Sequence, residues 1–328
     1  MNKVIGLGNA LVDIMTQLEN DAVLAQFDLP KGSMQLVDDQ FVNTISNGTL
    51  HLKKQLASGG SAANTIHGLA NLGAEVGFMG SVGNDEMGNF FKNDLHKANI
   101  KPILNIGNAQ SGLAVALVSQ DGERTFATFL GAAVELTPDF ITEESFKGYD
   151  ILHIEGYLVF NQDLIVKALQ IAKKLGMKVS LDLASYNVVE ATLDFLKKAV
   201  KESVDIVFAN EEEAKAFTGL EPEEALNAIA EMCEIAVVKI GSKGSLIKSK
   251  GETYKCGVID VKCLDTTGAG DLYASGFLYG LINNRNFNDC GKIGAILSGN
   301  VIEVIGAKIS ESKWNSIRNE VQNICKAN

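Results

Sequence analysis

Asp265-Thr266-Thr267-Gly268-Ala269-Gly270-Asp271 is a run of small residues between an apolar segment, 257–264, and a helical pattern over 272–282. A Gly-Ala-Gly opening leaves the first N–H groups of a helix unpaired beside the positive end of its dipole, so an anion can approach closely. The Asp271 carboxylate could accept a proton from a hydroxyl that attacks a phosphoryl group. The same residues also suit a simple helix N-terminus with a capping Asp. The stretch alone leaves both interpretations open.

The overall composition is that of an ordinary soluble globular protein. The chain has 328 residues, of which 46% are hydrophobic, and it can bury a core large enough for one domain with an excursion. A net charge of −11 and a pI near 4.9 argue against nucleic acid or an anionic membrane as partner. The N-terminus lacks a signal-peptide core, and no apolar run approaches ~18 residues. We therefore expect a cytoplasmic location.

The cysteines and histidines show no pattern typical of a metal site or a hydrolase. The cysteines form no CxxC pair and lie among apolar segments, which predicts reduced, buried thiols. The four histidines lack metal-ligand spacing, and there is no G-x-S-x-G motif, so a Ser/His/Asp hydrolase is poorly supported. The cysteines are Cys233, Cys256, Cys263, Cys290 and Cys325.

The N-terminal segment 4–8 is a short apolar strand that ends in Gly6-Leu7-Gly8. The third glycine of a dinucleotide-binding fingerprint is missing, because Leu11 stands in its place. Asn9 and Asp13 follow this strand. Ligands of open α/β folds bind at the carboxyl ends of strands, so these two side chains could hydrogen-bond a polyol. The alternative is an Asx turn that leaves the strand.

A second glycine-rich helix start, Ser58-Gly59-Gly60-Ser61-Ala62-Ala63-Asn64, opens a helix that we expect to run to about Leu72 and to end at Gly73. Paired glycines let the backbone approach a ligand, and Asn64 would face that ligand from the first turn. A tight strand-to-helix turn is the alternative. Two such starts in one chain make a substrate site and a phosphate site more credible together than singly.

Two segments depart from the regular alternation of strands and helices. Segment 14–57 mixes a strand-like piece, 32–37, with helical pieces at 38–45 and 50–55. Strands at 111–119 and 124–130 flank Asp-Gly and predict a β-hairpin. We expect these parts to form a small lid sheet. The predicted division is a core of 1–12, 58–109 and 132–328, and a lid of 13–57 and 110–131.

From residue 136 onward, apolar strands alternate regularly with polar helical stretches. This rhythm predicts an α/β fold, with a parallel sheet covered by helices on both faces. In this part we expect strands at 151–154, 178–183, 206–209 and 236–240, and helices at 162–175, 189–201, 211–218, 223–232, 271–283, 288–303 and 310–325. Earlier in the chain we expect a strand at 75–83 and a helix at 85–98.

Two further strand ends carry polar groups suited to a nucleotide. Asn210 with Glu213 could position the water shell of a Mg²⁺ ion, although glutamates in a first helical turn are usually solvated. Lys239-Ile240-Gly241-Ser242-Lys243-Gly244 is compatible with a loop against ribose and phosphates. It is not a P-loop, because the spacing fails.

Together these motifs resemble the ribokinase-like (PfkB) family of small-molecule kinases over nearly the whole chain. Gly59–Asn64 looks like the glycine-pair motif of that family, and 265–271 looks like its D-T-x-G-A-G-D anion-hole motif. The resemblance implies a three-layer α/β fold with a mostly parallel central sheet and a small β-sheet lid. It also implies ATP and Mg²⁺ as reaction partners.

The same resemblance implies roles for individual residues. Asp271 would be the catalytic base, and Gly268, Ala269 and Gly270 would form the anion hole. A potassium ion could lie behind this anion hole. The ATP site would include Asn210, Glu213 (reaching Mg²⁺ through water), Lys239, Gly241, Gly244, Thr266 and Ser298, and the potassium site Asp265, Gly306 and Ser310.

Within the family, Gly8-Asn9-Ala10-Leu11-Val12-Asp13 is similar to the start of adenosine kinases, as is Met34–Val37. This similarity implies that Asp13 holds ribose hydroxyls and that Arg124 meets phosphate on closure. Candidates for stacking on a base are Phe126, Phe129 and Tyr157. The implied substrate-binding residues are Asn9, Asp13, Gly59, Gly60, Asn64, Leu36, Phe126 and Arg124.

The resulting hypothesis is ATP-dependent transfer of the γ-phosphoryl group to a primary hydroxyl, that of the adenosine 5′-OH, giving AMP. A sugar kinase acting on ribose, fructose or a relative is the alternative. A non-catalytic nucleoside sensor is a third class, against which the intact Asp271 argues. The chain is expected to be a monomer or a lid-mediated homodimer.

Overall fold

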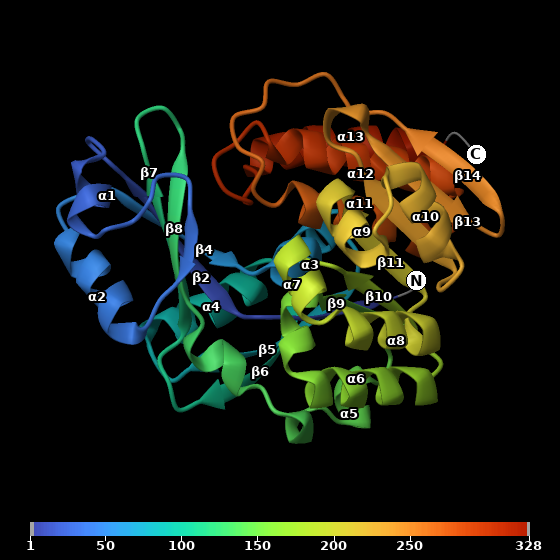
Figure 1. Cartoon of the computed structure of the whole chain (residues 1–328), viewed down its shortest axis with the longest axis horizontal. Coiled ribbons are helices and arrows are strands. Elements are labelled where there is room, and N and C mark those ends of the chain that lie inside the picture. The colour runs from blue at the N-terminus through green and yellow to red at the C-terminus, as the bar shows by residue number, and fades with distance from the viewer. Residues whose placement is uncertain (1–2, 327–328) are drawn as a thin grey trace.

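The computed structural model describes residues 3–326, which form a large α/β body and a smaller β-sheet beside it (Figure 1). The body is built on a nine-stranded sheet, parallel from β12 to β6, with an antiparallel hairpin at one edge. In spatial order the strands are β14 (Glu252–Cys256), β13 (Ser245–Ser249), β12 (Ile235–Lys239), β11 (Ile206–Asn210), β10 (Lys178–Asp182), β9 (Ile151–Glu155), β1 (Val4–Leu7), β5 (Val76–Gly83) and β6 (Ile100–Gly107).

Helices cover both faces of this sheet, and strands such as β1, β5 and β9 are buried along their whole length. On one face lie α3 (Ser61–Asn71), α4 (Glu86–Lys97), α11 (Ala269–Ile282) and α12 (Phe287–Val301), with α13 (Glu311–Lys326) outside α12. On the other lie α5 (Glu143–Phe146), α6 (Gln162–Lys174), α7 (Tyr186–Ala191), α8 (Leu193–Ser203), α9 (Glu211–Thr218) and α10 (Pro222–Ala230). The predicted three-layer α/β fold is confirmed.

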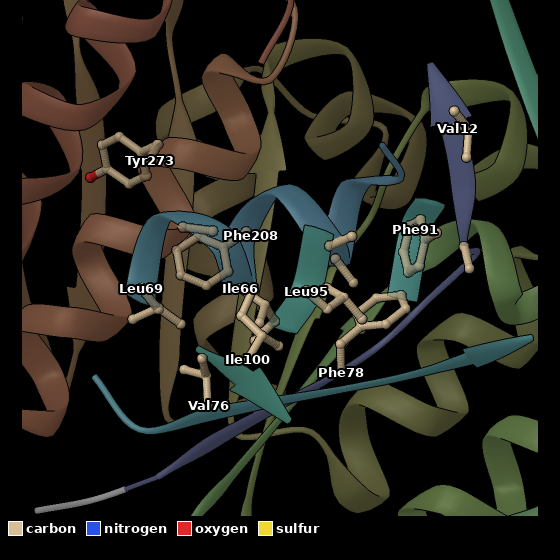
Figure 2. Close-up of a cluster of buried hydrophobic side chains, with 14 of the residues drawn as sticks. Val12, Ile66, Leu69, Val76, Phe78, Phe91, Leu95, Ile100, Phe208 and Tyr273 are labelled. Atoms are coloured by element: carbon tan, nitrogen blue, oxygen red, sulfur yellow. The ribbon is translucent and has the colours of Figure 1, made fainter. Parts of the chain in front are cut away.

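The core beneath α3 is filled by aliphatic and aromatic side chains from strands and helices far apart in sequence (Figure 2). Phe78 of β5 and Phe91 of α4 have ring centroids 5.5 Å apart. Phe208 of β11 meets Phe277 of α11 edge to face at 5.4 Å. Such aromatic contacts add stabilisation beyond their buried area, and they fix α11 over the sheet.

The smaller sheet has five strands, in the order β3 (Met34–Leu36), β8 (Arg124–Phe129), β7 (Gly112–Val118), β2 (Leu11–Gln17) and β4 (Lys54–Gly59). The predicted hairpin is present as β7 and β8, and Gly122 in its turn has φ of +87°. One face of the sheet packs against α1 (Ala22–Gln26) and α2 (Asp39–Gly48). The other face is turned toward the body of the molecule.

Several local predictions were wrong. Segment 50–55, predicted helical, leads into β4, because pairing with β2 outweighs its local helical pattern. The predicted helix 189–201 is split at Thr192 into α7 and α8. Strand β2, which contains Asp13, and strands β6, β13 and β14 were not predicted, and 257–264 forms no regular element. Short 3₁₀ turns cover Gly131–Glu135, Pro138–Phe140, Gly156–Phe160 and Gly241–Lys243.

The cysteines only partly follow the prediction of buried thiols. All five are free, and Cys256 and Cys290 are buried. Cys263 is exposed, because it lies in the irregular segment that precedes α11. Within residues 3–326, no helix is both long and apolar enough to cross a membrane.

Candidate active site

A polar cavity of about 620 Å³ lies at the carboxyl ends of β10, β11 and β12. The last residues of these strands, Asp182, Asn210 and Lys239, line it. The start of α11 closes another side of the cavity. Ten predicted site residues lie in its wall: Asp271, Ala269, Gly270, Asn210, Glu213, Lys239, Gly241, Gly244, Thr266 and Ser298.

The N-terminus of α11 has the conformation expected of an anion-binding site. Gly268 is left-handed, with φ of +72°, and no side chain caps the helix. The Ala269 N–H donates to the Thr266 carbonyl at 3.1 Å, so it is already paired. No acceptor for the N–H groups of Gly268 and Gly270 lies within the described chain. These two groups are therefore available to an anion.

Asp271 is held by the helix that follows the paired glycines. Ser61 Oγ donates to one carboxylate oxygen at 2.7 Å, and Asn64 Nδ2 donates to the other at 2.9 Å. Burial raises the pKa of Asp271 to about 6, although these two hydrogen bonds oppose the rise. The residue is thus a stronger base than a free aspartate and stays ionised at neutral pH.

Close packing of α3 on α11 makes these contacts possible. A Cβ at Gly68 would lie 2.4 Å from Ser275 Oγ, so only glycine permits this approach of the two helices. Asn64 Oδ1 is buried and has no hydrogen-bond partner in the part of the chain that is described. A ligand hydroxyl could satisfy this acceptor, since buried polar atoms seldom stay unpaired.

Asn9 does not point freely into the site, contrary to its predicted contact with a polyol. Its backbone N–H and its Nδ2 both donate to Glu155 Oε1, at 2.8 and 2.7 Å. Glu155 also accepts from the Ala62 N–H at 3.0 Å, and burial raises its pKa to about 7. Gly60 has φ of +96°, and a Cβ there would lie 2.2 Å from the Asn9 carbonyl oxygen.

Sequence reasoning missed Glu155 and Asp182, although the signal was present. Each is a carboxylate that ends an apolar strand, β9 or β10, and both are buried. Such an ending places a charged group at the ligand-binding edge of a parallel sheet. Glu155 ties together the end of β1, the end of β9 and the start of α3.

Asp13 lies on the face of the lid sheet that looks toward Asp271. Burial raises its pKa to about 7, the Lys308 charge opposes the rise, and the Asp271 charge adds to it. A Cβ at Gly59 would lie 2.2 to 2.5 Å from the Asp13 carboxylate atoms, so Gly59 makes room for this group. Lys308, also missed from sequence, donates to Ser58 Oγ at 2.7 Å.

Strand register places four predicted substrate residues on one face of the lid sheet. Paired residues across a ladder, and alternate residues along a strand, point the same way. Phe129 is on the opposite face and packs into the core, whereas Tyr157 lines the 620 Å³ cavity. The shared face carries Asp13, Leu36, Phe126 and Arg124, the apolar residues Leu11, Met15, Met34, Ala57, Ala114, Ala116 and Val118, and the polar residues Gln17, Gln55 and Thr128.

Arg124 lines a second cavity, of about 500 Å³, between the hairpin and the segment before α11. Its Nη2 donates to Asp265 Oδ1, and its guanidinium carbon lies 5.4 Å from the centre of the Phe126 ring. Nη1 is buried, and no acceptor for it occurs among residues 3–326.

The residues of the predicted potassium site do not fit such an ion in this structure. Both Asp265 oxygens accept hydrogen bonds, from the Thr267 N–H at 2.7 Å and from the Gly306 N–H at 2.6 Å. The Gly306 N–H and the Arg124 guanidinium therefore already contact the Asp265 carboxylate, the group that a potassium ion would need most. Ser310 is exposed and hydrogen-bonds Ser312 at 3.1 Å.

The wall of the first cavity that is formed by the ends of β10, β11 and β12 is strongly charged. Asn210 and Glu213 form a reciprocal capping box at the start of α9, and burial raises the pKa of Glu213 to about 7. Lys239 Nζ lies 3.0 Å from Asp182. Burial alone would lower the pKa of Lys239, but the nearby carboxylates of Asp182 and Glu213 raise it overall.

These residues fit a magnesium ion held through water. Five carboxylates line the cavity, those of Asp182, Glu213 and Asp271 and the exposed ones of Glu211 and Glu212, and Lys239 is the single lysine among the lining residues. No group of three His, Cys, Asp or Glu side chains in the described chain could hold a metal directly. Mg²⁺ takes oxygen ligands and keeps several of its waters, so a water-mediated contact from Glu213 suits its chemistry.

Comparison with known proteins identifies the same kinase family that the sequence motifs resemble. The model of the pfkB family of carbohydrate kinases matches residues 45–314. The adenosine kinase of Saccharomyces cerevisiae is 30% identical over 339 aligned residues, covering 94% of this chain and 99% of the yeast protein.

Two solved structures resemble this one over almost the whole chain. The probable sugar kinase of Rhizobium etli is 33% identical, with a TM-score of 0.87 and coverage of 97% and 98% of the two chains. The adenosine kinase of Sinorhizobium meliloti is 31% identical, with a TM-score of 0.87 and coverage of 97% and 99%. The chain therefore belongs to the pfkB family of carbohydrate kinases and is a phosphotransferase that uses an alcohol group as acceptor.

Proposed function

We propose that this kinase transfers the γ-phosphoryl group of ATP to the 5′-hydroxyl of adenosine, giving AMP. The observation that carries the proposal is the lid face opposite Asp271. Asp13 on this face suits ribose hydroxyls. Its cross-strand neighbours Ala57 and Ala114 are small, and Ala116, Met15 and Phe126 lie on the same face. A flat purine matches such an apolar surface, whereas a free sugar would leave it in water.

The chain's own residues account for the chemistry at the acceptor. Ser61 and Asn64 orient the Asp271 carboxylate, which takes the proton of the attacking hydroxyl. The N–H groups of Gly268 and Gly270 donate to the transferred phosphoryl group as its charge develops. Closure of the lid face over the acceptor excludes water, which would otherwise compete as acceptor.

The ATP phosphates would lie along the charged wall of the first cavity. Lys239 supplies a positive charge there, and Mg²⁺, positioned through water by Glu213, would offset the phosphate charge. Gly241 and Gly244 have positive φ values, +54° and +96°, which bend the loop after β12 back toward the cavity. This bend lets the backbone approach the nucleotide closely.

Similarity to two proteins named adenosine kinase, at 30% and 31% identity, supports the nucleoside assignment. A sugar kinase acting on ribose, fructose or a related compound is the second candidate, because the Rhizobium etli protein at 33% identity is named a probable sugar kinase. We also propose that residues 13–57 and 110–131 form the lid and that the remaining residues form the core. The protein would act in the cytoplasm, as a monomer or as a homodimer formed through the lid.

The test is ADP release by the purified protein with Mg-ATP and adenosine, inosine, guanosine, ribose, fructose or no acceptor. Adenosine turnover at micromolar concentration, abolished in Asp271→Asn, is the expected result. Turnover with a sugar alone would overturn the nucleoside assignment and keep the mechanism. Adenosine binding by calorimetry without turnover on any acceptor would favour the sensor.

A further inference from the structure

We propose that the guanidinium of Arg124 supplies the fixed positive charge at Asp265 behind the anion hole, so that this kinase needs no monovalent metal ion. The inference rests on the proposed role of Gly268 and Gly270 as phosphate ligands. It makes Arg124 a positioning residue that acts through Asp265. It also replaces the potassium site expected from the resemblance to other family members.

Asp265 lies in a buried environment. Its side chain is 2% exposed, so its charge requires a compensating partner inside the protein. Arg124, 11% exposed, is the cation that contacts it. The remaining partners of the Asp265 carboxylate are the N–H groups of Thr267 and Gly306. The carboxylate thus has one cationic and two neutral donors, so its charge is compensated by groups of the chain itself.

A hydrogen bond to the backbone connects Asp265 to the anion hole. Thr267, whose N–H is held by Asp265, is the residue immediately before Gly268. The Ala269 N–H bonds back to Thr266, so 265–269 forms one compact turn that sets the direction of the free N–H groups. Since Asp265 organises this turn, loss of its neutralising cation would disturb the N–H groups that face phosphate.

The cation at Asp265 comes from the lid sheet. Arg124 is the first residue of β8 and lies on the lid face that also carries Asp13 and Phe126. The ring of Phe126 supports its guanidinium, at 5.4 Å. The lid therefore delivers the positive charge to the anion-hole turn. Nη1 remains unpaired and can donate to a ligand oxygen at the same time.

The experiment compares turnover in potassium, sodium and tetramethylammonium chloride at equal ionic strength, with the acceptor that gives ADP release. Wild-type kcat should agree within about twofold in all three salts. Arg124→Ala should lose about tenfold or more of kcat in tetramethylammonium, less than the loss of a direct oxyanion donor. Added guanidinium, but not urea, should restore part of the kcat of Arg124→Ala. The Arg124→Lys variant should keep its kcat without an added cation.

Lys31→Met is the matched control. It removes a lid cation that pairs with Asp21 and Asp121 but does not touch Asp265. This variant should keep the salt-independent kcat of the wild type. Severalfold activation of the wild type by potassium would overturn the proposal. So would an Arg124→Ala variant whose loss appears only in the KM of the acceptor and responds to no cation.

A second readout does not require turnover and so separates this proposal from the proposed function. Thermal unfolding of the ligand-free wild type should be the same in potassium and tetramethylammonium chloride. The melting temperature of Arg124→Ala should be higher in guanidinium at low millimolar concentration than in the same concentration of urea. Equal melting temperatures of the variant in these two additives would contradict a cation role at Asp265.

Discussion

The pH dependence of catalysis provides a sharp test of the site, through the hydroxyl of Ser61. Asp271 must be ionised to accept a proton, and burial raises its pKa to about 6. As pH falls through this value the carboxylate is protonated, so kcat/KM should decline with an acid limb near pH 6. Asp271→Asn removes the acceptor and should lower kcat by about 10²-fold or more.

The hydrogen bond from Ser61 stabilises the ionised form of Asp271, at 2.7 Å. A hydrogen bond to a charged group is worth about 1.5 to 3 kcal/mol, and water can replace part of it in the variant. A remaining loss of about 1.4 kcal/mol corresponds to one pKa unit. Ser61→Ala should therefore move the acid limb upward, from about pH 6 to about pH 7.

Thr65→Val is the matched control for Ser61→Ala. Thr65 lies one turn further along α3, and its hydroxyl donates to the backbone carbonyl of Asp271 at 3.1 Å, not to the carboxylate. The acid limb of the kcat/KM profile of Thr65→Val should remain at the wild-type pH. The assay is kcat/KM from initial rates of ADP release between about pH 5 and about pH 9. An unmoved limb in Ser61→Ala, or equal shifts in both variants, would refute the role of Asp271 as base.

Three further predictions follow from the same contacts. Gly59→Ala places a Cβ within 2.5 Å of the Asp13 carboxylate, so initial-rate kinetics should show a rise of about tenfold or more in the acceptor KM and an unchanged KM for ATP. Lys239→Met leaves the carboxylates around the first cavity without their cation. Calorimetry should show at least about tenfold weaker Mg-ATP binding, and unaltered affinity would exclude a phosphate role for this lysine. Glu155→Ala leaves three N–H donors unpaired, so urea unfolding should show a loss of about 3 kcal/mol or more. A loss below about 1 kcal/mol would mean that water replaces the carboxylate.

The sequence was informative wherever function depends on a local backbone pattern. The 265–271 run and the paired glycines Gly59 and Gly60 could be interpreted directly, because positive φ values and bare helix starts need particular small residues in a row. Strand and helix alternation after residue 136 likewise fixed the α/β class, since apolar strands between polar helices are typical of a parallel sheet.

Tertiary structure alone decided which distant residues meet. Asp271 is 207 residues from Asn64, and Arg124 is 141 residues from Asp265, so no local pattern could pair them. Alternation along β8 separates Phe126 from Phe129 by face, but the residues that share the face of Phe126 depend on the long-range pairing of β7 with β2. The proposed replacement of a potassium ion by Arg124 depends on the same kind of long-range contact. The charge that completes Asp265 comes from another sheet, and only the folded chain brings that guanidinium to the carboxylate.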